Sequence, residues 1–301
     1  MRCYLTDAAG RAWFPEHSIK YDKQFLGFSE QDFITDGQFE IALPESQYVL
    51  TVEHGPEYLP ASQKIEVHSG MTQEVKIELK RWINMNDRGW YSGDLHTHRD
   101  WHEMSEILLA EDLNIGPTIT QWAAAWAPDD PMGIMASSPG RMTLLTRSPE
   151  VATAGAAIRN VDSAHAYSIY DTEIERPGGA GTVVFVGLTA PFVAQGTLLS
   201  PLDSDFAARV HNLSGYVDAE KLIYREVPVL VADGLIDFAG VVNNAFNRHG
   251  AITGRIKDSK VVADKSSPET PEEAALVSMD IYYKYLNCGS GFQFQPALPL
   301  V

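Results

Sequence analysis

The stretch Trp90-Tyr91-Ser92-Gly93-Asp94-Leu95-His96-Thr97-His98 decides how this sequence is interpreted. In a β-strand, residues two apart project from the same face, so Asp94, His96 and His98 would share one side. Two histidines at that spacing are roughly 7 Å apart along a flat strand. Their rings can meet one ion where a strand twists at its end, or each can bind a different ion. An ordinary polar strand end is the alternative interpretation.

Neutral imidazole is a good ligand for Zn, Mn or Fe. The nearby Asp94 is expected to orient a ligand histidine without binding the metal itself. Taken alone, the stretch leaves two interpretations open, a metal site that uses His96 and His98 or an ordinary polar strand end.

Downstream of this stretch, apolar strand-like runs alternate with helical ones, which is typical of β/α architecture. Besides Trp90–His98, the expected strands are Ile115–Gln121, Met142–Thr146, Thr182–Leu188 and Phe238–Asn244. The expected helices are Glu103–Leu113, Asp218–Leu235 and Pro271–Asn287. The last has the strongest boundary signals, with Thr270 as N-cap, proline at the first helical position and Gly289 after the end.

Residues 1 to about 80 have the pattern of β-strands instead. Apolar and polar residues alternate over Phe39–Leu43 and over Tyr48–Val52, which predicts a hairpin with one buried face. A second pair is expected at Ile65–Val67 and Val75–Leu79. The sequence thus predicts two domains, a small β-sandwich over residues 1–82 and an α/β domain over residues 83–301.

The composition is that of a globular protein, with 45% hydrophobic residues in 301. Forty acidic residues against 23 basic ones give a net charge of −17. A surface this negative repels phosphate backbones and anionic lipid, so neither nucleic acid nor a membrane is an expected partner.

No apolar run approaches the ~20 residues that span a bilayer, and the N-terminus carries no signal peptide. A soluble protein is expected, cytoplasmic by default, with export of a longer precursor as the alternative. The two cysteines are Cys3 and Cys288. They do not suggest a disulfide scaffold, and Cys288, at the end of an apolar helical pattern, is expected to be a buried thiol.

The Gly93–His98 motif belongs to an ordered series of fragments: Arg81–Met85, Gly89–His98, Ala110–Asn114, Asp171–Arg176, Val217–Lys221 and Tyr283–Gly289. This series, over roughly residues 30 to 289, resembles the carbaryl-hydrolase-like branch of the PHP (polymerase and histidinol phosphatase) metallohydrolases. The first domain is similar to a carboxypeptidase-regulatory-like domain. The resemblance implies a distorted (β/α)7 barrel that gathers two or more divalent ions at the C-terminal ends of its strands.

The resemblance also implies roles for particular residues. His96 and His98 carry over as metal ligands, and Glu173 or Glu175 is the best match for a later carboxylate that bridges the ions or acts as a base. The alternative interpretation is that the two glutamates lie in a solvated loop before a Gly-rich turn. Support for substrate or ligands is implied for Asp218, Glu220, Lys221 and Asn244.

The sequence departs from the family pattern in three places. Ala245 stands where relatives often have histidine, and Thr120-Gln121-Trp122 has no Asp-His. The residues after Gly289 contain neither His nor Asp, so the closing ligand pair and the last barrel strands are expected to be missing.

Three further residues are candidates by position. His102 follows the histidine motif and His165 is a spare imidazole, so each is a possible extra metal ligand or an ordinary surface residue. Glu111 lies on the apolar face of its expected helix, where a structural ion pair is favoured over a ligand role.

The preferred hypothesis is a metal-dependent hydrolase of a small-molecule ester, either a phosphoester or a carbamate or carboxylic ester. Zn, Mn or Fe would activate water. Two alternatives remain. A catalytically degenerate relative would bind a ligand or partner without turnover, and a closed structural zinc site would bind no exchangeable water.

Overall fold

The computed structural model describes residues 1–25, 28–124, 143–146, 149–176, 181–196, 200–241, 246–247, 250–251, 255–257, 260–262, 271–288 and 293–295. They form a mixed α/β structure with antiparallel and mixed sheets and few helices. The chain divides into two compact units. The first unit comprises Met1–Gly93, His102–Ile115 and Val161–Ala166, and the second unit comprises the rest.

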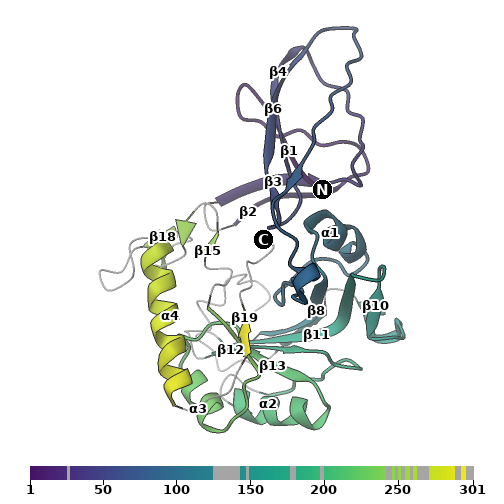
Figure 1. Ribbon diagram of the computed structural model, residues 1–301. Helices are drawn as coiled ribbons and strands as arrows, with labels where there is room; N and C mark the ends of the chain where they lie inside the picture. The colour runs from purple at the N-terminus through teal and green to yellow at the C-terminus, as the bar shows by residue number, and fades with distance from the viewer. Residues whose placement is uncertain are drawn as a thin grey trace. The chain divides into compact units, whose positions relative to one another are not determined.

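A five-stranded antiparallel sheet forms the centre of the first unit (Figure 1). Its order is β2 (Ile19–Phe25), β3 (Phe28–Ile34), β1 (Arg2–Asp7), β4 (Ser46–Glu53) and β6 (Ala61–Val67). Two short strands, β5 (Tyr58–Leu59) and β7 (Lys80–Arg81), pair separately, and a 3-10 turn follows at Asn86–Arg88.

The alternating residues of β4 explain this sheet. Tyr48, Leu50 and Val52 all point into one apolar cluster, which also contains Cys3, Leu5 and Phe33. The expected hairpin between Phe39–Leu43 and Tyr48–Val52 is wrong, because β4 pairs with β1 and β6. A long ladder on both edges of β4 satisfies more backbone groups than a local hairpin would. The segments 39–43 and 75–79 lie outside the ladders, yet Ile41, Leu43, Ile77 and Leu79 still pack against the cluster.

Helix α1 (Met104–Glu111) also belongs to the first unit, and its expected apolar face is confirmed. Met104, Ile107 and Leu108 are buried. Glu111 is buried too, and its Oε1 lies 2.6 Å from Nε of Arg2. The charge on the apolar face of the helix therefore belongs to a structural ion pair.

A mixed eight-stranded sheet forms the second unit (Figure 1). Its main path runs β19 (Gln293–Gln295), β14 (Phe238–Gly240), β13 (Tyr216–Ala219), β12 (Gly181–Val186), β11 (Ala166–Arg176), β8 (Ile115–Ala124) and β9 (Thr143–Thr146), and β10 (Ile158–Asn160) pairs with β11.

The expected (β/α)7 barrel is not confirmed. The pairs β13–β14 and β14–β19 are parallel, whereas β8–β9, β11–β12 and β12–β13 are antiparallel. Antiparallel neighbours can be joined without a crossover helix. These pairs therefore do not follow the repeating β/α order that a barrel requires. Among the described residues the sheet is open, because its path ends at β19 and β9.

Helices in the second unit match the sequence in part. Helix α4 (Pro271–Asn287) has the predicted bounds, although Thr270 and Gly289 are outside the described residues. Helix α2 (Asp203–Asn212) packs on β12 and β13 (Figure 1). The expected helix Asp218–Leu235 is wrong, since its start belongs to β13 and only α3 (Val227–Ala232) is helical. Pairing with strands on both sides outweighs the helix-start signal of the acidic residues.

Small elements complete the described chain. They are the 3-10 helix Pro149–Thr153 and two hairpins, β15 (Phe246–Asn247) with β16 (Gly250–Ala251) and β17 (Arg255–Lys257) with β18 (Lys260–Val262). The expected strands at Ile115, Met142 and Thr182 are confirmed as β8, β9 and β12. The strand expected from Phe238 is described only as far as Gly240, and Val242–Ala245 lie outside the described residues.

The stretch Trp90–His98 does not form the regular strand expected of it. It makes two isolated parallel bridges, Gly93 to Ile115 and Thr97 to Thr118. The Asp94 carboxylate accepts a hydrogen bond from the backbone N–H of His96 at 2.9 Å, so that donor is directed away from a continuous ladder. A Cβ on Gly93 would lie 2.9 Å from the carbonyl oxygen of Ile115, so the close approach requires glycine.

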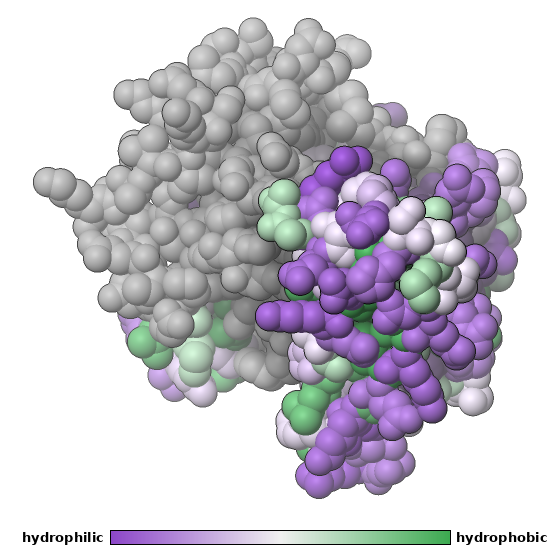
Figure 2. All heavy atoms as spheres, turned by 90° about the horizontal axis from the view of Figure 1, so that it is seen from above, coloured by the Kyte–Doolittle hydropathy of each residue, from purple (hydrophilic) through white to green (hydrophobic). Residues whose placement is uncertain are grey.

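The described surface is mainly polar on the face shown in Figure 2, where hydrophobic residues appear in small groups between hydrophilic ones. None of the described helices combines the length and the apolar character needed to cross a bilayer. Both cysteines are free thiols, and Cys3 is buried. The expectation of a buried Cys288 is wrong, because this residue follows the last turn of α4 and is exposed.

Candidate metal site

Two imidazoles converge in the second unit, at the segment that bridges to β8. The Thr97 bridge holds this segment beside the start of β8, and Thr97 itself is fully buried. The flanking His96 and His98 have ring centroids 4.8 Å apart, and their Nε2 atoms are separated by 3.0 Å. The two rings are therefore much closer than the ~7 Å spacing of a flat strand, and they face one point.

Glu173 on β11 supplies a third donor atom at that point. Its Oε2 lies 2.9 Å from Nε2 of His98 and 3.9 Å from Nε2 of His96. Tetrahedral ligands at about 2.1 Å from a zinc ion are ~3.4 Å apart, so the three observed separations bracket the required value. These three residues form a group that could hold a metal ion.

The position of Glu173 follows from strand register. Glu173 pairs with Val184 on β12, and Val184 pairs with Asp218 on β13. Directly opposed residues in adjacent strands share a face, so Glu173 and Asp218 lie on the same side of the sheet as Val184. Ile174 takes the opposite face, where it is fully buried.

Further charged groups surround the three donors. Oε1 of Glu220, just after β13, lies 3.6 Å from Nδ1 of His96. Lys221 forms an ion pair with the other oxygen of Glu220. Gly240 on β14 keeps this region tight, since a Cβ there would lie 2.5 Å from the carbonyl oxygen of Glu220. Backbone packing thus restricts the main chain that carries Glu220.

The buried carboxylates differ in their affinity for protons. Burial raises the pKa of Glu173, but the adjacent His96 and His98 outweigh it, so the net pKa of Glu173 is below its ordinary value. Burial and the charge of Glu220 raise the pKa of Asp218 to about 8. Burial and the charge of Glu173 raise the pKa of Glu175 to about 7. Of these three carboxylates, Glu173 is therefore the one most readily ionised at neutral pH.

Asp94 stabilises the backbone of the histidine motif. It is almost fully buried and accepts the backbone N–H of His96, so it fixes the main chain that carries the imidazole. The orienting role expected of Asp94 thus acts on the main chain of His96.

Trp122 forms one side of the site. Its ring lies 5.3 Å from the ring of His98, centroid to centroid, at an interplanar angle of 49°. Its Nε1–H donates a hydrogen bond of 3.1 Å to Oε2 of Glu175. Sequence reasoning missed Trp122, which follows directly after the strand expected to end at Gln121. An aromatic residue at the end of a strand next to the histidine motif is the signal that could have indicated it.

No family model, curated protein or solved structure matches this chain.

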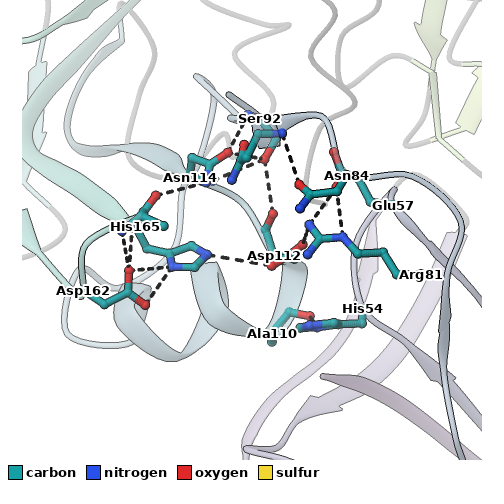
Figure 3. A network of polar contacts seen from close by, with 12 residues as sticks. His54, Glu57, Arg81, Asn84, Ser92, Ala110, Asp112, Asn114, Asp162 and His165 are labelled. Atoms are coloured by element: carbon teal, nitrogen blue, oxygen red, sulfur yellow. Dashed lines mark hydrogen bonds and ion pairs between the residues drawn. The ribbon is translucent and has the colours of Figure 1, made fainter. Parts of the chain in front are cut away.

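Two other candidate ligands lie in the first unit and are not members of the group. His102 is exposed. Nδ1–H of His165 donates a hydrogen bond of 2.8 Å to the carboxylate of Asp162, and Nε2 of His165 lies 3.9 Å from Asp112 (Figure 3). Asp112 in turn forms an ion pair with Arg81 at 2.6 Å. His165 therefore belongs to a polar network of the first unit. The remaining candidate, Asn244, lies outside the described residues.

Proposed function

We propose that this protein is a metal-dependent hydrolase of small-molecule esters, whose divalent ion is bound by His96, His98 and Glu173. The observation that carries the proposal is the convergence of three donor atoms, with separations of 3.0, 2.9 and 3.9 Å. Three lone-pair donors crowd one point stably only when a proton or a cation lies between them.

The number of protein ligands favours catalysis over a closed structural site. Among the described residues the group has three members, two histidines and one carboxylate. Catalytic zinc sites use three protein ligands and leave a further position for water or substrate, whereas structural sites use four. A bound ion would lower the pKa of a water molecule and polarise the ester oxygen.

The chain's own residues would prepare the site for that chemistry. Glu173, with its lowered pKa, stays ionised at neutral pH and is available as a ligand. Burial lowers the pKa of Lys221, but the charge of Glu220 outweighs burial, so the pKa is raised and the ammonium stays protonated. Lys221 therefore compensates one of the buried negative charges near the site.

Ester hydrolysis at this site would consume one water molecule for each ester bond broken. The oxygen of one water molecule bonds to the acyl or phosphoryl centre, the bond to the alcohol oxygen breaks, and the alcohol leaves with a proton. The resemblance to PHP metallohydrolases supports a phosphoester, a carbamate or a carboxylic ester as the substrate class. It also supports a barrel-derived ancestry and more than one ion, and both remain part of the proposal.

The test is metal binding by purified variants, followed by turnover. Wild-type protein stripped of metal and reloaded with Zn²⁺ or Mn²⁺ should bind at least one ion per chain by elemental analysis. It should then hydrolyse p-nitrophenyl acetate or p-nitrophenyl phosphate. His96→Ala and Glu173→Gln should each weaken binding by more than 100-fold and abolish hydrolysis, because each removes one of three ligands. His68→Ala, a histidine outside the group, is the matched control.

The proposal has two distinct ways to fail. If His96→Ala binds metal as tightly as the wild type, the proposed site is wrong. If metal binding depends on His96 but no ester is hydrolysed, the site instead serves a protein that binds a ligand without turnover.

A further inference from the structure

Glu175 and Trp122 form a contact that the proposed ligand set does not use. Trp122 is on β8 and Glu175 on β11, and these strands are neighbours in the sheet. The indole packs on His98 with one side, while its Nε1–H donates to Oε2 of Glu175. The side chains therefore form a continuous chain from Glu175 through Trp122 to His98.

His98 needs a neighbouring side chain to fix its rotamer more than His96 does, because His98 is the more exposed of the two. The side chain of His98 is 23% exposed and that of His96 is 10% exposed. A partly exposed histidine has alternative rotamers open to it, and a ligand held in one rotamer loses less freedom when metal binds. A fixed ring packed beside the imidazole limits those alternatives.

The indole can do this only if it is fixed itself. Trp122 is half-buried, and its hydrogen bond to Glu175 sets the rotation of the indole plane. Glu175 is two residues from Glu173 on the same strand, so both carboxylates project from one face of β11. Glu173 reaches the histidines and Glu175 reaches the tryptophan.

We infer that Trp122 is a positioning residue that holds His98 in its metal-binding rotamer, and that Glu175 acts through Trp122 rather than on the metal. This inference rests on the proposed function. It assigns Glu175 a different role from the base or bridging ligand that the family resemblance implies, and it adds a residue with no counterpart in that resemblance.

Four variants separate these roles by Zn²⁺ affinity, measured in competition with a chromophoric chelator. Glu175→Gln keeps an oxygen that can accept the indole N–H, so its affinity should stay within about 3-fold of the wild type. Glu175→Ala removes the acceptor and Trp122→Phe removes the donor, so each should weaken binding about 10-fold. Trp122→Ala also removes the ring and should weaken binding by about 100-fold.

A second measurement reports geometry without turnover. Co²⁺ loaded into the site should give a visible absorption band whose intensity and position depend on the ligand arrangement. The band should be unchanged in Glu175→Gln and altered in Glu175→Ala and Trp122→Phe. Trp90→Phe, which changes an exposed tryptophan of the first unit, is the matched control and should match the wild type in both measurements.

The possible outcomes lead to different conclusions. If Glu175→Ala and Trp122→Phe bind Zn²⁺ and absorb like the wild type, positioning through Trp122 is wrong. If Glu175→Gln loses affinity as much as Glu175→Ala does, the charge of Glu175 acts directly and the inference is overturned. If His96→Ala does not weaken binding at all, the proposed site fails first. Far-UV circular dichroism checks that each variant is folded, and Trp122→Phe is the variant least expected to disturb folding.

Discussion

At the scale of single residues, the candidate site concentrates buried negative charge. Glu173, Glu220, Asp218 and Asp94 are all at most 3% exposed, whereas Lys221 is the cation that pairs with one of them. Oδ1 of Asp218 makes no hydrogen bond to any of the described residues. A buried carboxylate without such a bond is costly when ionised, which is why the pKa of Asp218 is raised.

Asp218 leads to a prediction about pH. Its pKa of about 8 in the folded chain is above the ordinary aspartate value, so between about pH 4 and 8 the folded state holds a proton that the unfolded state releases. The stabilisation is present at low pH and is lost as pH rises through 8. In Asp218→Asn this titration is absent. From pH 5 to pH 8 the free energy of unfolding of metal-free wild type should fall relative to the variant, by up to ~1.4 kcal/mol per pH unit.

Urea unfolding in EDTA at a series of pH values measures this difference. Asp280→Asn is the control, because Asp280 is on an exposed face of α4 and should follow the wild-type curve. Parallel curves for the wild type and Asp218→Asn would show that burial does not perturb the titration of Asp218.

Residue identity predicted part of the site. Two histidines two apart, with an aspartate before them, indicate a metal site because imidazole is a common ligand. Glu173 and Glu175 were expected as alternatives, because the family resemblance did not distinguish between them. The contacts of the folded sheet distinguish them, because Glu173 meets the histidines and Glu175 meets Trp122. Such long-range contacts leave no local pattern in the sequence.

At the scale of elements, the ion pair between Arg2 and Glu111 joins the first strand of the first unit to α1. Both side chains are at most 10% exposed. Asp32 on β3 lies 3.9 Å from the same guanidinium. A Cβ on Gly55 would overlap the backbone of Glu111, so the helix end is packed closely against this unit's other segments.

Breaking one half of this pair should destabilise the protein. Arg2→Met leaves the Glu111 carboxylate buried without its partner, which should lower the free energy of unfolding by about 3–5 kcal/mol. Arg2→Met combined with Glu111→Leu removes both charges and should recover much of the loss. Chemical denaturation of the single and double variants measures the coupling, and strictly additive losses would contradict it.

Elements were predictable where local signals and tertiary pairing agree. Helix α4 has proline at its start and an apolar face, and it was predicted with its observed bounds. The segment at Asp218 shows the opposite case. Its acidic residues resemble a helix start, but Val217 and Ala219 are fully buried in a strand paired on both sides. The secondary structure of such a segment is decided by strand partners that come from other parts of the chain.

At the scale of the whole molecule, a net charge of −17 attracts divalent cations in general. Binding of a cation at the proposed site is therefore distinguished from this general attraction by its effect on the free energy of unfolding. A ligand that binds only the folded state at 100 times its dissociation constant adds about 2.7 kcal/mol to the free energy of unfolding. Zn²⁺ at that concentration should stabilise the wild type by this amount. His96→Ala should show little change.

Urea unfolding with Zn²⁺ and with EDTA, at fixed ionic strength, measures the stabilisation. Equal stabilisation of the wild type and His96→Ala would indicate general association of Zn²⁺ with the acidic surface. Salt screens that association, so repeating the measurement in 0.5 M NaCl should leave the specific effect largely intact.

The glycine at position 240 makes the second unit sensitive to a change outside the three proposed ligands. One added methyl group on β14 would meet the main chain of the neighbouring strand end and push it outward. Gly240→Ala would then move an acidic group beside His96 while leaving every donor atom chemically intact. A variant at this position would thus change the charged surroundings of His96 through backbone spacing alone.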